Sequence, residues 1–144
     1  MEVAIRQVQD SAELDACYLL RMAVFVDEQK VPPWEEMDSY DEGAQHFALF
    51  CDGAIVGTAR VVDLGEGTGK VGRVAIRKEL RGTGLGRRLM NEVVAYGFTR
   101  YDRLILDAQI SVQDFYTKLG FAAEGDNFLD CGIEHIRMTA ARST

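Results

Sequence analysis

A glycine-rich loop between an apolar strand pattern and an amphipathic helix pattern constrains this sequence more than any other feature. The loop, residues 81–86, reads RGTGLG, and the apolar side chains after it keep to one helical face until about Thr99. Backbone N–H groups at the start of a helix form an anion site, and glycine lets phosphate oxygens approach that backbone closely. Arg81 and Arg87 can add charge-assisted hydrogen bonds. The sequence therefore predicts a pyrophosphate site at this loop.

The spacing of the glycines separates this loop from two common phosphate motifs. Gly82, Gly84 and Gly86 form GxGxG, whereas the dinucleotide fingerprint is GxGxxG with an acidic residue about 20 positions further on. Asp107 follows Gly82 by about 25 positions, which is too far for that fingerprint. The loop also lacks the lysine of the GxxxxGKS/T phosphate loop. A flexible surface turn is the alternative to an anion site.

Charge is distributed unevenly along the chain, whose net charge is −7. Segment 73–88 holds six basic residues against Glu79 and carries +5, so the remainder carries −12. An acidic chain is a poor binder of nucleic acid, and a basic segment on an acidic body indicates a small anionic ligand. Segment 27–42 holds seven acidic residues against Lys30. This acidic segment either forms a solvated face or attracts a cationic substrate.

Length and cysteine content predict a single domain over residues 1–144 in a reducing, cytoplasmic setting. The chain falls within the range of roughly 100–200 residues that is usual for one domain. Cys17, Cys51 and Cys131 form no CxxC pair and leave one thiol over if two were bridged. We expect no metal site, no signal peptide and no membrane span, since no window approaches about 18 consecutive apolar residues.

Apolar periodicity predicts the order strand, helix, three strands, helix, strand, helix, two strands. Asp10 or Ser11 can cap the first helix, which the prolines after Val31 cannot continue. The predicted strands are 3–8, 45–51, 55–62, 70–76, 104–108, 121–124 and 133–139. The predicted helices are 11–26, 84–99 and 111–119, with a further helical turn open near Glu35. This order indicates a mixed α/β or α+β sheet covered by helices.

Two regions resemble the GNAT superfamily of acetyl-CoA-dependent N-acetyltransferases. The family's pyrophosphate signature, Q/R-x-x-G-x-G/A, is similar to residues 81–86. Residues 109–121 resemble the family pattern N-x-x-A-x-x-F-Y-x-x-x-G-F, with Gln109 and Val112 replacing its Asn and Ala. Residues 24–32, together with residues 35–38 and His46, further resemble a small bacterial branch whose substrates are mostly uncharacterised.

The resemblance implies the GNAT fold and acetyl-CoA as co-substrate. That fold is a mixed, mostly antiparallel twisted sheet of about six or seven strands flanked by about four helices. The strand ending at Ile76 resembles the family's splayed fourth strand, whose backbone pairs with the pantetheine arm. The implied cofactor-binding residues are Val74, Ala75, Ile76, Arg81, Gly82, Thr83, Gly84, Leu85, Gly86, Arg87 and Gln109.

The resemblance also implies a catalytic tyrosine. Tyr116 would meet the departing CoA thiolate and donate a proton or a hydrogen bond to it, whereas core packing is the alternative. The position of the glutamate base in several relatives holds Lys70 here. His135 in the last predicted strand is expected to be a packed polar residue. The base stays open between a chain of waters and the side chains of Glu28, Glu36, Asp38, His46 and Asp63.

The acceptor pocket of this family lies between the first helix and the second strand, where the acidic segment 27–42 stands. The candidate substrate-binding residues are Glu28, Trp34, Glu36, Asp38 and His46. We expect a primary amine, small molecule or peptide, with positive charge, and neither nucleic acid nor membrane as a partner; a homodimer is open. Two alternatives are a non-catalytic CoA-binding module and an acyltransferase that uses a longer acyl-CoA.

Overall fold

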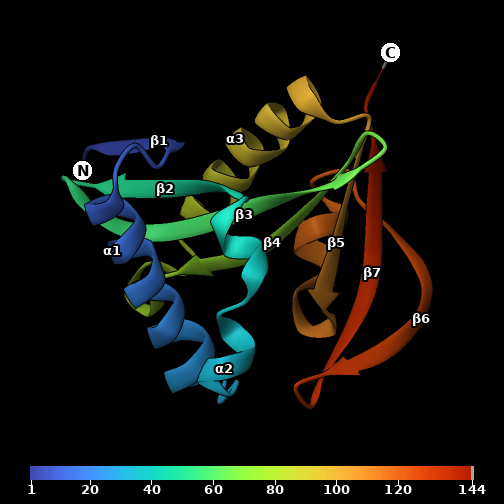
Figure 1. Ribbon diagram of the computed structural model, residues 1–144, viewed down its shortest axis with the longest axis horizontal. Coiled ribbons are helices and arrows are strands. Elements are labelled where there is room, and N and C mark those ends of the chain that lie inside the picture. The colour runs from blue at the N-terminus through green and yellow to red at the C-terminus, as the bar shows by residue number, and fades with distance from the viewer. Residues whose placement is uncertain (144) are drawn as a thin grey trace.

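The computed structural model describes residues 1–143 and consists of a seven-stranded sheet with four α-helices around it (Figure 1). The strands are β1 (Val3–Gln7), β2 (Gln45–Cys51), β3 (Ala54–Gly65), β4 (Thr68–Ile76), β5 (Arg103–Gln109), β6 (Ala122–Asp130) and β7 (Ile133–Ala141). The α-helices are α1 (Ser11–Arg21), α2 (Pro33–Glu36), α3 (Leu85–Arg100) and α4 (Gln113–Thr117). The predicted mixed α+β class and the predicted order of elements are confirmed.

Neighbouring strands in the sheet follow the order β1-β2-β3-β4-β5-β7-β6. Within residues 1–143 every neighbouring pair is antiparallel except β4 with β5, which α3 connects. The parallel ladder runs only from Thr68, opposite Arg103, to Lys70, opposite Ile105. Beyond that point the two strands diverge, as Figure 1 shows. The sheet therefore splits near its middle, within its fourth neighbouring pair, β4 with β5.

A β-bulge in β4 accompanies this split. Thr58 of β3 lies opposite Ala75 and Arg60 opposite Gly72, so two residues of β4 face the single residue between them. Arg73, one of the two, has a φ of 52°, in the left-handed region that a side chain rarely adopts. A bulge bends its strand and increases the local twist, which turns the end of β4 away from β5.

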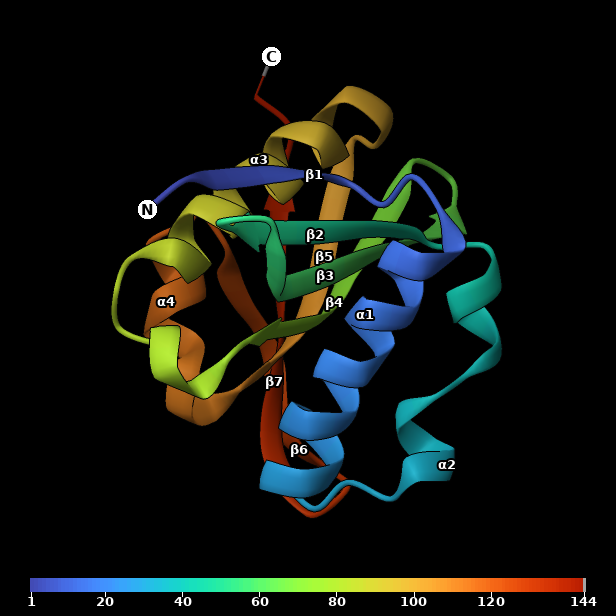
Figure 2. The same cartoon turned by 90° about the vertical axis from the view of Figure 1, so that its left-hand side faces the viewer.

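The helices cover opposite faces of the sheet, with α1 on one face and α3 on the other (Figure 2). The apolar face predicted for the second long helix packs into the main core through Leu85, Leu89, Met90 and Val93. Leu20 at the end of α1 joins a smaller cluster on the other face. None of the helices in residues 1–143 combines the length and the apolar character needed to cross a membrane.

Two segments differ from the sequence prediction. The first helix does not stop near Val26, because the chain widens after α1 into a π-helical turn, Met22–Glu28. The last hairpin is longer than predicted, since β6 continues to Asp130 through the stretch 126–130 that was expected to be a connection. The strand continues because its register with β7 shifts between Glu124 and Phe128. Residues 125–127 form a bulge there, and pairing with β7 resumes at Phe128.

A buried ion-pair network fastens the acidic segment 27–42 to the sheet. Arg21 of α1 is 1% exposed, and its guanidinium donates to Glu36 Oε1 at 2.8 Å and to Asp41 Oδ1 at 2.7 Å. Arg60 of β3 donates to Asp41 Oδ1 at 2.8 Å and to Asp38 Oδ1 at 2.7 Å. Burial alone raises the pKa of Asp41, but the hydrogen bonds from both arginines outweigh it and lower that pKa.

Arg73, the bulged residue of β4, is the third guanidinium of this network. Its Nε lies 3.2 Å from Glu36 Oε1, and its side chain also donates to the Glu36 carbonyl oxygen and to Asp38. Three arginines thus face three carboxylates. The network is neutral, which is the condition under which charges are tolerated in a protein interior.

Replacing Arg21 tests how much this network stabilises the fold. Arg21→Met leaves the Glu36 and Asp41 carboxylates buried without their main partner, so the free energy of unfolding should fall by about 3–5 kcal/mol. Arg142→Met is the matched control, because its pair with Asp102 is just as short, at 2.6 Å, but is 47% and 73% exposed. Its loss should be about 0–1 kcal/mol. Equal losses in urea unfolding at neutral pH would contradict this account.

Candidate active site

A cleft of about 810 Å³ opens where β4 and β5 separate. Its walls are β4, the loop 81–86, the end of the π-helical turn, β5, α4 and the hairpin of β6 and β7. Most of the predicted cofactor-binding residues line it, namely Val74, Ala75, Ile76, Arg81, Gly82, Gly84, Gly86, Arg87 and Gln109. Thr83 and Leu85 do not, because the Thr83 hydroxyl donates to the Leu80 carbonyl and Leu85 is packed in the core.

The glycine-rich loop turns the chain sharply from β4 into α3. Gly82 and Gly84 have φ values of 78° and 87°, which glycine adopts without strain. The first helical hydrogen bond of α3 runs from the Arg88 N–H to the Gly84 carbonyl at 3.2 Å. The N–H groups of the three residues between them therefore have no acceptor within the helix, and the dipole of this helix of 16 residues adds to their positive potential. These free N–H groups can donate hydrogen bonds to an anion.

Arg81 holds this loop in place. Its Nε donates to the Ile76 carbonyl at 3.0 Å, and its two terminal nitrogens donate to Glu28 Oε1 and Oε2 at 2.7 and 3.0 Å. The hydrogen bond from Arg81 lowers the pKa of Glu28, so this pair stays charged. Glu28, a predicted substrate residue, thus braces the loop and lies outside the cleft lining. Arg87 also lines the cleft beside this loop.

The divergence of β4 from β5 leaves a free backbone edge along the cleft. Residues 71–76 of β4 pair with β3 on one side and have no partner strand within residues 1–143 on the other. Free N–H and C=O groups on a strand edge pair readily with an extended chain that carries amides. The edge ends at Ile76, directly before the segment that leads into the glycine-rich loop. An extended amide chain and an anion can therefore be held end to end.

Tyr116 of α4 also lines the cleft. Its ring packs edge-on against Phe115 and Phe121, with ring centroids 5.1 and 6.3 Å away. Burial raises the pKa of the Tyr116 phenol to about 12, because the charged phenolate is poorly solvated there. The phenol therefore keeps its proton at neutral pH and can donate it to an anion that forms in the cleft.

The other predicted substrate residues do not line the cleft, although Glu36 and Asp38 contact Arg73, which does. Trp34 on α2 is 77% exposed, and neither it, Glu36, Asp38 nor His46 contributes to the cleft lining. His46 is buried, with its Nε2 2.8 Å from the Asp41 carbonyl oxygen. Asp27, Glu35 and Glu42 of the acidic segment are exposed, and Glu35 lies beside Asp130 at the rim of the cleft. Glu36, Asp38 and Asp41 are instead paired with arginines. These arginines come from α1, β3 and β4, outside the acidic segment, and they neutralise much of its negative charge.

Asp63, the remaining candidate base, also lies outside the cleft lining. Asp63 is exposed near the end of β3, where its Oδ1 accepts from the Gly65 N–H at 2.8 Å.

Lys70 lines the cleft, but its Nζ lies 3.1 Å from Asp107 Oδ2. A second cation, Arg137 of β7, donates to the same carboxylate. Burial alone raises the pKa of Asp107, but the hydrogen bonds from Arg137 and Lys70 outweigh it and lower that pKa.

Sequence reasoning missed two polar groups of the cleft, Asp107 and His135. Each lies on a strand that looks like a plain core strand in the sequence. The pairing of β5 with β7 reveals them, since it places Asp107 opposite Arg137 and Gln109 opposite His135. Alternation along β5 then puts Asp107 and Gln109 on one face, and only the register between the two strands shows which side chains of β7 join them.

Free helix N-terminal N–H groups, a free strand edge and a buried tyrosine along one cleft are able to accommodate an acyl-CoA. The family model of the Acetyltransferase (GNAT) domain matches residues 9–142. The uncharacterised N-acetyltransferase YjcF of Bacillus subtilis is 31% identical, covering 90% of this chain and 94% of YjcF. The chain therefore belongs to the GNAT acetyltransferase family and is a transferase.

Solved structures agree with this assignment over nearly the whole chain. ElaA of Escherichia coli has a TM-score of 0.87 at 26% identity, covering 96% of this chain and 99% of ElaA. An acyl-CoA N-acyltransferase from Pseudomonas aeruginosa has a TM-score of 0.84 at 30% identity, covering 97% and 99% of the two chains. The predicted GNAT fold is thus confirmed.

A matched pair of glycine substitutions tests the anion loop. Gly84 and Gly53 have nearly equal φ values, 87° and 84°, and a Cβ added at either meets no atom within 4 Å. Gly84→Ala and Gly53→Ala should therefore lower the free energy of unfolding by similar amounts, about 1–2 kcal/mol. Only Gly84→Ala places a methyl group in the cleft, so it should raise the Kd for acetyl-CoA at least tenfold in calorimetric titration. Similar Kd values for the two variants would remove the loop from the binding site.

Tyr116→Phe tests the tyrosine, because it keeps the ring and removes the hydroxyl. If the phenol donates to the leaving thiolate, kcat should fall by about 10²–10⁴-fold, with little change in acetyl-CoA affinity. Since the pKa of Tyr116 is raised to about 12, its proton is lost only above that pH. The wild-type kcat should therefore show no decline due to Tyr116 between about pH 8 and about pH 10. An unchanged kcat in the variant would reduce Tyr116 to a packing residue.

Proposed function

We propose that this protein transfers an acetyl group from acetyl-CoA to a primary amine, by direct attack while both are bound. The observation that carries the proposal is the cleft between β4 and β5, which joins an anion loop, a free strand edge and Tyr116 in one continuous space. Acetyl-CoA has a matching order of parts: a pyrophosphate, an extended arm with two amides, and a thioester at its end.

Each part of acetyl-CoA has a complementary part of the chain in this proposal. The pyrophosphate binds the free N–H groups at the start of α3, with Arg87 beside them. The amides of the arm pair with the backbone of β4 near Val74 and Ile76. The thioester then lies toward Tyr116, whose proton neutralises the departing thiolate. Holding both reactants in one cleft supplies much of the rate enhancement.

The free thiols favour a reducing compartment. Cys17, Cys51 and Cys131 are all unbridged, and Cys131 is exposed. An exposed thiol persists where glutathione and thioredoxin keep cysteines reduced. We therefore propose that the protein works in the cytoplasm.

A panel of primary amines, assayed for release of free CoA and for the acetylated product, tests the proposed function. We expect turnover of acetyl-CoA with at least one amine, and much slower turnover of longer acyl-CoA donors. S-acetylpantetheine, which lacks the phosphates, should have a KM at least tenfold higher than that of acetyl-CoA. Tight binding of acetyl-CoA without turnover of any amine would favour a CoA-binding module. Faster turnover of a longer donor would favour an acyltransferase of different specificity.

A further inference from the structure

The imidazole of His135 is a polar group of the cleft to which the proposed function gives no role. We propose that His135 is the base that takes a proton from the acceptor amine; this inference rests on the proposed N-acetyltransferase activity. It follows from how the ring is held, from which nitrogen is left free, and from the state of the other candidate bases in the cleft.

One hydrogen bond fixes the tautomer of His135. Its Nδ1 lies 2.7 Å from the carbonyl oxygen of Ile133, two residues earlier in the chain. A carbonyl oxygen can only accept, so Nδ1 must carry the hydrogen and donate it. In the neutral ring the lone pair then belongs to Nε2, which has no hydrogen-bond partner within residues 1–143. The chain thus presents a free proton acceptor on a residue that lines the cleft.

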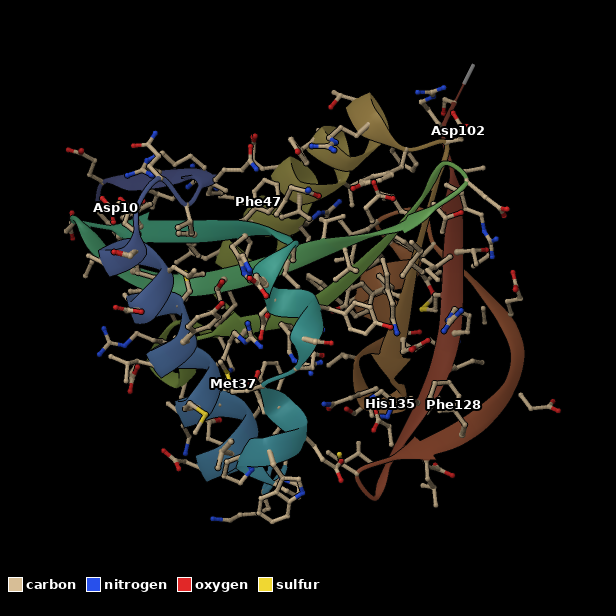
Figure 3. The ribbon with its side chains drawn as sticks, viewed as in Figure 1. Asp10, Met37, Phe47, Asp102, Phe128 and His135 are labelled. Carbon is tan, nitrogen blue, oxygen red and sulfur yellow. The ribbon has the colours of Figure 1, made fainter. Side chains whose placement is uncertain are left out.

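Packing holds this ring in one orientation. Phe128 of β6 lies directly opposite His135 of β7, and their rings stack with centroids 5.8 Å apart and an angle of 22°. Figure 3 shows the two side chains next to each other, toward the end of the β6–β7 hairpin. The residue is only 9% exposed, so its ring has little freedom to turn. An acceptor held in one orientation is the kind of group that serves as a base.

The position of His135 fits this role. It lies opposite Gln109 of β5, whose side-chain amide donates to Gln29 Oε1 at 2.9 Å. This hydrogen bond connects β5 to the residue after the π-helical turn, and both glutamines line the cleft. His135 therefore lies beside a point where the two sides of the cleft come together.

The other acidic and basic groups in the cleft are occupied or exposed. Both Asp107 oxygens are engaged, by Lys70 and Arg137, and its lowered pKa makes it a weak base. Asp130 is exposed at the rim, in a group with Glu35 and Cys131. Lys70 is a cation that is already paired with a carboxylate. His135 is left as the acceptor in the cleft that has no hydrogen-bond partner within residues 1–143.

His135 and Tyr116 together account for every proton transfer in the reaction. His135 Nε2 takes one proton from the ammonium group and later passes it to solvent. The free amine attacks the thioester carbonyl carbon, a C–N bond forms, and the C–S bond breaks. Tyr116 gives its proton to the departing thiolate and regains one from the nitrogen that becomes the amide. The net products are the acetylated amine, CoA as its thiol, and one proton in solution.

His135→Asn removes the proposed base and keeps the hydrogen bond, because the asparagine amide nitrogen can occupy the place of Nδ1 and donate to Ile133. We would compare benzylamine, which is protonated at neutral pH, with aniline, which is a free base there. With benzylamine the variant's kcat/KM should fall by about 10²–10⁴-fold. With aniline it should fall less than tenfold, since no proton has to leave before attack. The Kd for acetyl-CoA should stay within about twofold.

An equal loss with both amines would assign His135 a structural role, and no loss with either would overturn the proposal. The imidazole ¹⁵N spectrum provides a test that needs no turnover. His135 should show a protonated Nδ1 and a free Nε2, whereas His46, whose Nε2 faces the Asp41 carbonyl, should show the opposite pattern. His135→Asn assigns the signals. A protonated Nε2 in the neutral ring of His135 would overturn the proposal even if the protein acetylates no amine, which would itself contradict the proposed function.

Discussion

The early end of hydrogen bonding between β4 and β5 is the constraint on which the rest of the structure depends. The ladder stops at Lys70 and Ile105, and the other polar groups of the cleft lie beyond that point. Unpaired strand edges usually cost stability and invite aggregation. Here the free edge lies inside a cleft, covered from one side by the π-helical turn and from the other by α4. In the proposed function, an extended ligand completes the sheet where protein strands do not.

The buried ion-pair network explains how this opening persists. Arg73 at the bulge of β4 is held by Glu36 and Asp38, and these are held in turn by Arg21 and Arg60. The network therefore ties the bulged strand to the segment after α1. Buried ion pairs add little net stability compared with apolar packing, but breaking one is costly. The network thus holds β4, one wall of the cleft, in a fixed position relative to the segment after α1.

The order of elements and the place of the glycine-rich loop between β4 and α3 could be predicted because their signals are local. The periodicity of α3 and the glycines before it follow from neighbouring residues alone. The role of the acidic segment could not be predicted, since the arginines that neutralise Glu36 and Asp41 come from distant elements. His135 was missed for the same reason. Its free nitrogen follows from a bond to Ile133 and from strand register, and a single polar residue in a strand signals neither.

Backbone amide NMR during titration with acetyl-CoA tests the central claim most directly, that the free edge of β4 and the glycine-rich loop bind one extended ligand. The account predicts that the largest shift changes fall on residues 73–76 and 82–87 and saturate together at one equivalent. Amides of β1 and β2, on the far side of the sheet, should change little. Changes centred on another surface, or confined to the loop with the β4 amides unmoved, would contradict it.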